Sequence, residues 1–89
     1  MPSADATIVN KLGLHARAAA KLTHLAGNYK CEIWLSRSGR RVNAKSIMGV
    51  MMLAAGQGTS VQIEAQGADA EQAIAALTKL IADKFGEGE

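Results

Sequence analysis

The chain has 89 residues and a formal net charge of +2, with 48% hydrophobic and 20% charged residues. This length allows one compact domain but not separate catalytic and binding domains, and the composition excludes a disordered chain. We therefore expect residues 1–89 to form a single domain, whose chemistry lies on the surface of one small core or is supplied by a partner.

The charge is distributed unevenly along the chain. Residues 1–45 carry a net charge of +6 and residues 46–89 a net charge of −4. A basic half suits an anionic partner, such as a protein surface, a phosphate group or a nucleic acid. The single cysteine excludes an intramolecular disulfide, the first residues lack the pattern of a secretion signal, and no apolar run approaches the roughly 18 residues that cross a bilayer. These features predict a cytoplasmic protein.

The first predicted elements are a strand, a loop and a helix. Alternating apolar and polar residues predict the strand over residues 6–10. Residues 11–15 form a loop in which Gly13 provides backbone freedom. The alanine-rich stretch 16–26 predicts a helix, because alanine has the highest helix propensity and Gly27 is a stop signal.

A hairpin follows this helix. Apolar residues alternate with polar ones over residues 29–36 and 40–44, and Ser38–Gly39 between them is typical of a tight turn. The alternation directs Cys31 into the core and Trp34 to the opposite, partly exposed face of the sheet. A buried cysteine of this kind is a core residue and not a nucleophile.

The second half of the chain contains a helix, a strand and a longer helix. Ser46 caps a helix over residues 47–53, and residues 60–65 form the fourth strand. Asp69 caps the last helix, with Gln72 in the capping-box position. This helix buries a stripe of apolar residues: Ile74, Leu77 and Ile81, with Leu80 and Phe85 at its edge.

The resulting order of elements is β-α-β-β-α-β-α. Because the strands alternate between apolar and polar residues, one face of the sheet is packed and the other is hydrated. The predicted fold is α+β, an open-faced β-sandwich in which three helices cover one face of a four-stranded, mainly antiparallel sheet.

His15 is the first candidate for chemistry, since it lies where a glycine-containing loop enters a helix. The first backbone N–H groups of a helix have no intrahelical acceptor and carry partial positive charge, so a helix start binds phosphate. Arg17 adds a guanidinium suited to phosphate oxygens, and imidazole is a nitrogen nucleophile. By spacing alone, a capping or surface histidine is the more common explanation of this pattern.

Two motifs favour phosphoryl transfer over that explanation. Residues 13–20, Gly-Leu-His-Ala-Arg-Ala-Ala-Ala, resemble the active-site signature of the HPr family, the phosphocarriers of bacterial phosphotransferase systems. Residues 45–53, Lys-Ser-Ile-Met-Gly-Val-Met-Met-Leu, resemble the regulatory serine motif of the same family, and the two motifs have the family's usual separation. The predicted order of elements also follows that of the family.

The resemblance implies roles for three residues. His15 would carry the phosphoryl group on Nδ1, Arg17 would steady it, and Ser46 would be a regulatory site phosphorylated by a serine kinase/phosphorylase. Enzyme I would be the phosphodonor and Enzyme IIA proteins or domains the acceptors. The chain would then be a monomeric carrier and not an enzyme, with no cofactor and no metal. Ala18 stands where proline is commonest in the family, which reduces the pre-organisation of the helix start but not its helix propensity.

A carrier of this kind needs a surface that meets its partners. The residues expected at this surface are Leu14, Ala16, Ala20, Ile47, Met48 and Met51. Ile47 with Met48, or Met48 with Met51, would form an exposed apolar patch beside His15, and methionine suits a surface that fits several partners. Val50 and Leu53 of the same segment would fill the core.

Two alternatives stay open. A small nucleic-acid-binding domain would use the basic N-terminal half, although its strands lack the paired aromatic residues of sheet-based RNA binders. The basic residues available to it are Lys11, Arg17, Lys21, Lys30, Arg40 and Arg41. A regulatory relative would work through Ser46 in place of His15. We expect neither a nucleic acid nor a membrane as a partner.

Overall fold

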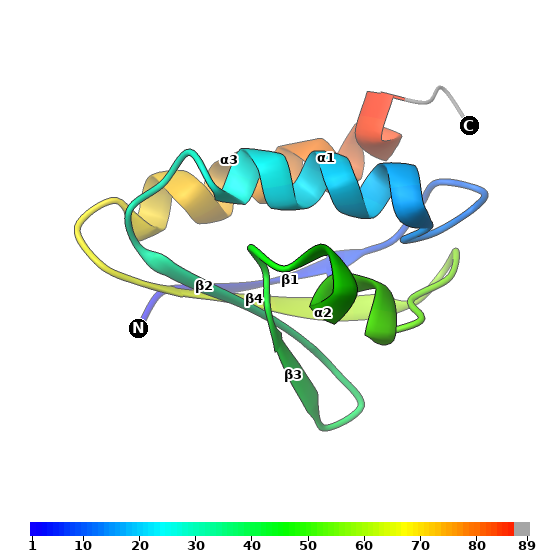
Figure 1. The fold of residues 1–89 in the computed structure, drawn as a ribbon, viewed down its shortest axis with the longest axis horizontal. Helices are drawn as coiled ribbons and strands as arrows, with labels where there is room; N and C mark the ends of the chain where they lie inside the picture. The colour runs from blue at the N-terminus through cyan, green and yellow to red at the C-terminus, as the bar shows by residue number, and fades with distance from the viewer. Residues whose placement is uncertain (87–89) are drawn as a thin grey trace.

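The computed structural model describes residues 1–86, and residues 87–89, the last three of the predicted domain, lie outside the described residues. The elements follow the predicted order β-α-β-β-α-β-α and end in a short 3-10 turn (Figure 1). They are, along the chain, β1 (Ser3–Thr7), α1 (Ala16–Ala26), β2 (Glu32–Arg37), β3 (Arg40–Asn43), α2 (Ile47–Met52), β4 (Ser60–Gln66), α3 (Ala70–Ala82) and η1 (Lys84–Gly86).

The strands form one antiparallel sheet in the order β1-β4-β2-β3. Figure 1 shows α1 and α3 lying along one face of this sheet, with α2 packed beside α1. The sheet residues that face the helices are buried: Ala6, Ile33, Leu35, Val61, Ile63 and Ala65. On the other face Trp34 is half-buried, and the Arg41 guanidinium lies 4.2 Å from the centre of its ring. The predicted open-faced β-sandwich is confirmed.

The first strand begins and ends earlier than predicted. It covers Ser3–Thr7 and not residues 6–10. Alanine and aspartate, which have low strand propensity, hide its start in the sequence. Ile8 follows the strand, where its N–H donates to the Thr59 carbonyl at 2.8 Å and its carbonyl accepts the Gly58 N–H at 2.7 Å. These two bonds tie the chain after β1 to the loop before β4.

β2 also begins later than predicted, because a carboxylate binds the backbone N–H groups before it. The Oδ2 atom of Asp69 accepts the N–H of Lys30, and Oδ1 accepts the N–H of Cys31, both at 2.9 Å. Asp69 does occupy the N-cap position of α3, but its side chain makes no capping hydrogen bond. The predicted capping box with Gln72 is therefore wrong, and the carboxylate ties the loop after α1 to the start of α3.

This arrangement predicts a pH-dependent contribution of Asp69 to stability. Its pKa is held below the ordinary value of a carboxyl, chiefly because the Lys30 N–H donates to the carboxylate. Since the folded state has the lower pKa, the carboxylate stabilises the fold above its ordinary pKa and loses that contribution as the pH falls through the lowered one. We expect Asp69→Asn to lower the thermal unfolding midpoint at neutral pH, and the difference to shrink as the pH falls below the ordinary pKa of a carboxyl. Glu71→Gln removes a charge from the same turn, and an equal loss there would contradict the prediction.

The segment after α3 packs more deeply than predicted. Lys84 and Phe85 have left-handed backbone conformations, with φ of 58° and 56°. This turn directs the Phe85 ring into the core, where it is 1% exposed and not at the edge of the helix stripe. The Nζ atom of Lys21 donates to the Phe85 carbonyl at 2.7 Å, which anchors η1 on α1.

Candidate functional site

His15 occupies the N-cap of α1, with an extended backbone (φ −72°, ψ 176°). Its carbonyl accepts the N–H of Ala19 at 2.8 Å, while the N–H groups of the first turn have no acceptor within the helix. The imidazole is half-buried, and Arg17 is exposed on that first turn. The start of α1 therefore combines a nucleophile, amide groups that stabilise an anion, and a guanidinium.

The loop before His15 is held in a conformation that only glycine allows. Gly13 has a φ of 67°, and a Cβ atom there would lie 2.5 Å from the Ala55 carbonyl oxygen. The same oxygen accepts the N–H of Leu14 at 2.9 Å. The buried Asn10 also donates through Nδ2 to the Gly13 carbonyl at 2.8 Å. These contacts fix the backbone that leads into the imidazole.

Ser46 occupies the N-cap of α2, as predicted, and its Oγ accepts the N–H of Gly49 at 3.1 Å. α2 packs against α1 and has six residues, which makes it roughly 9 Å long. Beyond its last residue, Met52, the chain turns into Ala55, which binds the loop before His15. A single short helix thus connects Ser46 to the support of His15.

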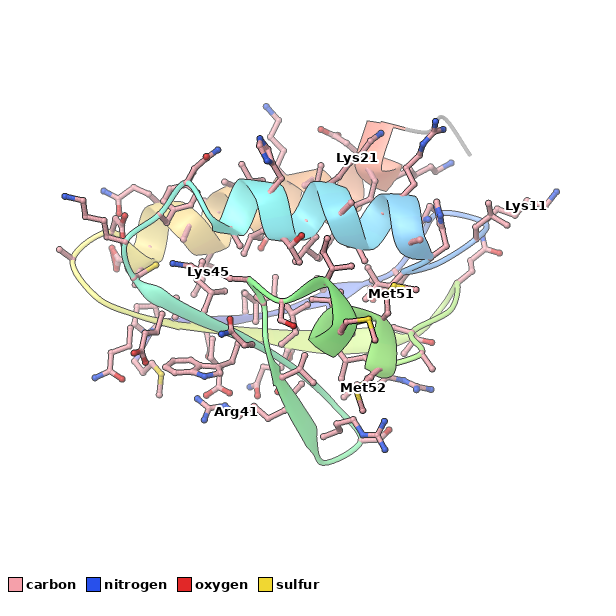
Figure 2. All side chains as sticks on the ribbon, in the orientation of Figure 1. Lys11, Lys21, Arg41, Lys45, Met51 and Met52 are labelled. Carbon is pink, nitrogen blue, oxygen red and sulfur yellow. The ribbon has the colours of Figure 1, made fainter. Side chains whose placement is uncertain are left out.

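The outer side of α2 is apolar. Its four exposed residues, which we call the α2 patch, are Ile47, Met48, Met51 and Met52. Met48 is 72% and Met52 60% exposed, and Figure 2 shows Met51 on the side of α2 toward α1 and Met52 on the side toward the β2–β3 hairpin. Val50 and Leu53 are buried, so the predicted division of this segment between surface and core is confirmed.

The residues expected at the partner surface around His15 differ in exposure. Ala16 and Ala20 are exposed, whereas Leu14 is 6% exposed and offers little area to a partner. Leu14 acts from the core, as a support of the loop. Asn10 was not among the predicted site residues, although a polar residue after the apolar pair Ile8 and Val9 and three positions before Gly13 is the pattern by which it could have been found.

The basic residues of the nucleic-acid alternative do not form one track. Figure 2 shows Lys11 and Arg41 at opposite corners of the molecule. Arg41 covers Trp34 on the open face of the sheet and forms an ion pair with Glu64 at 3.5 Å, whereas Lys21 on α1 donates to a backbone carbonyl. A continuous strip of phosphate contacts, as nucleic-acid binding requires, does not follow from this arrangement.

Cys31, the one cysteine of the chain, offers no second nucleophile. Cys31 is buried in the core, and its burial raises the pKa of the thiol, which disfavours a nucleophilic thiolate. Within residues 1–86 no group of three histidine, cysteine or acidic side chains is arranged to hold a metal ion. None of the helices in that range has the length and apolar character needed to cross a membrane.

Known proteins resemble this chain along almost its whole length. A family model described as "PTS HPr component phosphorylation site" matches residues 2–83. The chain is 64% identical over 85 residues to "Phosphocarrier protein HPr" of Cupriavidus necator, with 96% of each covered. It is 50% identical over 90 residues to the protein of the same name from Pseudomonas aeruginosa, with 100% of each covered. The crystal structure of HPr-C-His from Thermoanaerobacter tengcongensis matches with a TM-score of 0.95 and 47% identity over 98% of each chain.

Proposed function

This chain belongs to the HPr family of phosphocarrier proteins of the phosphotransferase system, and we propose that it accepts a phosphoryl group from phospho-Enzyme I on His15 and passes it to Enzyme IIA proteins or domains. The observation that carries the proposal is the position of His15 at the N-cap of α1, behind a loop that only glycine can form. The carrier would act as a monomer in the cytoplasm, either in sugar uptake or in a regulatory branch.

The start of α1 supplies what such a transfer needs from a carrier. The Nδ1 lone pair of His15 would form the N–P bond while the donor's bond to phosphorus breaks, and the reverse exchange would load the acceptor. The first-turn N–H groups and Arg17 would stabilise the charge on the phosphoryl oxygens. The α2 patch would meet each partner in turn, so that the partners provide the catalytic machinery and this chain remains a carrier and not an enzyme.

The direct test is the chemistry of the adduct. Incubation with Enzyme I and phosphoenolpyruvate should add one phosphate that is lost in acid, as expected of a phosphohistidine. His15→Ala should abolish this adduct, while His24→Ala should keep it, since His24 is the second of the two histidines and lies exposed in the last turn of α1. An adduct that survives in His15→Ala, or a parent chain that takes no acid-labile phosphate, would refute the proposal.

We also propose that Ser46 is a regulatory phosphorylation site. Its position at the N-cap of α2, beside the α2 patch, supports this role, because a phosphate there adds about two negative charges to the surface that meets Enzyme I. If the facing surface of Enzyme I is acidic, phosphorylation weakens the encounter by repulsion.

A charge at Ser46 is therefore expected to slow phosphoryl acceptance. Ser46→Asp should raise the KM for Enzyme I roughly tenfold and leave the stability of the chain nearly unchanged, because aspartate is as good an N-cap as serine. Steady-state transfer from Enzyme I measures the first effect and thermal unfolding the second. Ser3→Asp places the same charge at the exposed start of β1, and an equal rise in KM there would show that net charge alone is responsible.

A further inference from the structure

The hairpin of β2 and β3 places two arginines directly opposite each other. Arg37 and Arg40 are partners across the Ser38–Gly39 turn, so their side chains project from the same face of the sheet. Two like charges directly opposite each other destabilise a hairpin unless each guanidinium donates to a hydrogen-bond acceptor of its own. The pair therefore needs a structural reason.

The carbonyls at the end of α2 are the acceptors of this pair. Arg40 donates through Nη1 to the Met52 carbonyl, and Arg37 through Nη1 to the Leu53 carbonyl, both at 2.8 Å. The preceding carbonyls of α2 accept backbone N–H groups of the following turn instead. The two guanidinium groups thus donate to the last two carbonyls, those of Met52 and Leu53, which have no acceptor role within α2. Cations are favoured at this carboxyl end of a helix.

The backbone that follows these carbonyls supports the phosphoryl site. Ala54 has a φ of 52°, which reverses the chain, and the next carbonyl, that of Ala55, accepts the Leu14 N–H at 2.9 Å. The same segment fills the space in which Gly13 would carry a side chain. An unbroken series of contacts therefore leads from the two arginines to the backbone before His15.

We propose that Arg37 and Arg40 are positioning residues for His15. They hold the carboxyl end of α2 and thereby fix the segment 54–56, on which the loop before His15 rests. Neither side chain needs to touch the phosphoryl group or a partner for this role. The expected effect on phosphoryl acceptance rests on the proposed function, whereas the expected effect on the loop before His15 does not.

The structural consequence is tested by hydrogen exchange and NMR on the full chain. In the double variant Arg37→Gln/Arg40→Gln, the Leu14 amide should exchange roughly tenfold faster, while the amide of the buried Leu77 should stay within about twofold. The imidazole signals of His15 should shift, with His24 as the internal reference.

The matched control is Arg41→Gln. It removes one positive charge from the same hairpin, where the double variant removes two, and its side chain lies over Trp34 on the other face of the sheet. The control should change neither Leu14 exchange nor the His15 signals. The Arg37→Lys/Arg40→Lys variant should restore the parent behaviour, because each arginine uses a single donor in these bonds and lysine also supplies one.

The kinetic consequence is tested by transfer from Enzyme I. The double glutamine variant should lower the turnover of phosphoryl acceptance roughly tenfold, with a KM for Enzyme I no higher than that of Arg41→Gln. Unchanged Leu14 exchange, unchanged turnover, or a rise in KM alone would overturn the positioning role. If the parent chain accepts no phosphate, the proposed function fails, and the exchange and NMR measurements still decide whether the arginines hold the loop.

Discussion

Replacement of Gly13 by alanine is expected to destabilise the fold by about 2–4 kcal/mol and to slow phosphoryl acceptance roughly 10²-fold. The added Cβ would meet the Ala55 carbonyl oxygen at 2.5 Å and the Cα atom of Gly56 at 2.7 Å, and both of these are backbone atoms that no side-chain rotation can move away. The two segments must separate, which breaks the bond between Leu14 and Ala55 and displaces His15. Chemical unfolding measures the first effect, and the initial rate of transfer from Enzyme I measures the second.

Gly39→Ala isolates the cost of the backbone conformation from that of the clash. Gly39 also has a positive φ, of 83°, but a Cβ atom there would meet nothing within 4 Å. This variant should lose only about 1 kcal/mol and should transfer phosphate normally. Equal losses in the two variants would mean that the left-handed conformation alone matters and that contact with the segment 55–56 does not position His15.

The parts of the fold that could be predicted from the sequence are those set by neighbouring residues. The bounds of α1, Ala16–Ala26, are those predicted, because alanine-rich helix propensity and the stop at Gly27 are local signals. The hairpin turn at Ser38–Gly39 is likewise formed as predicted, with positive φ at both residues, as a two-residue turn of this hand requires.

The errors arise where a distant residue decides the backbone. The start of β2 depends on Asp69, whose carboxylate binds Lys30 and Cys31 across 39 and 38 positions of the chain. A capping box is the local interpretation of the same aspartate, and in the structure the long-range bonds replace it. The sequence pattern cannot distinguish a capping box from bonds to Lys30 and Cys31, because Asp69 stands directly before the last helix in both cases.

The candidate site divides in the same way. His15, Arg17 and Ser46 follow from the resemblance of two short motifs, and the structure places the first at the start of α1 and the last at the start of α2. The support of the loop before His15 comes from Asn10 and from Ala55, which act through a buried side chain and a backbone carbonyl. A backbone carbonyl carries no signature in a sequence, so the bond between Leu14 and Ala55 that fixes the loop could not be predicted from it.

The Phe85 ring completes the core from the short turn that follows α3. Its side chain is 1% exposed, and η1 contacts both α1 and α3. Phe85→Ala should destabilise the fold by about 3–5 kcal/mol, the usual cost of removing a buried phenyl ring. Domains of this size have total stabilities near the lower end of about 5–15 kcal/mol, so the variant should be partly unfolded at body temperature.

Two further variants separate lost packing from a disturbed turn. Phe85→Leu keeps much of the side-chain volume and should cost about 1–2 kcal/mol. The Lys21 bond to the carbonyl of residue 85 remains in Phe85→Ala and in Phe85→Leu, because it involves the backbone. Leu12→Ala removes an apolar side chain that is 67% exposed and should change stability by less than about 0.5 kcal/mol. Urea unfolding of the three variants gives these values. A loss in Phe85→Ala no greater than that in Leu12→Ala would show that the ring is dispensable, and that α1 and α3 hold the core together without it.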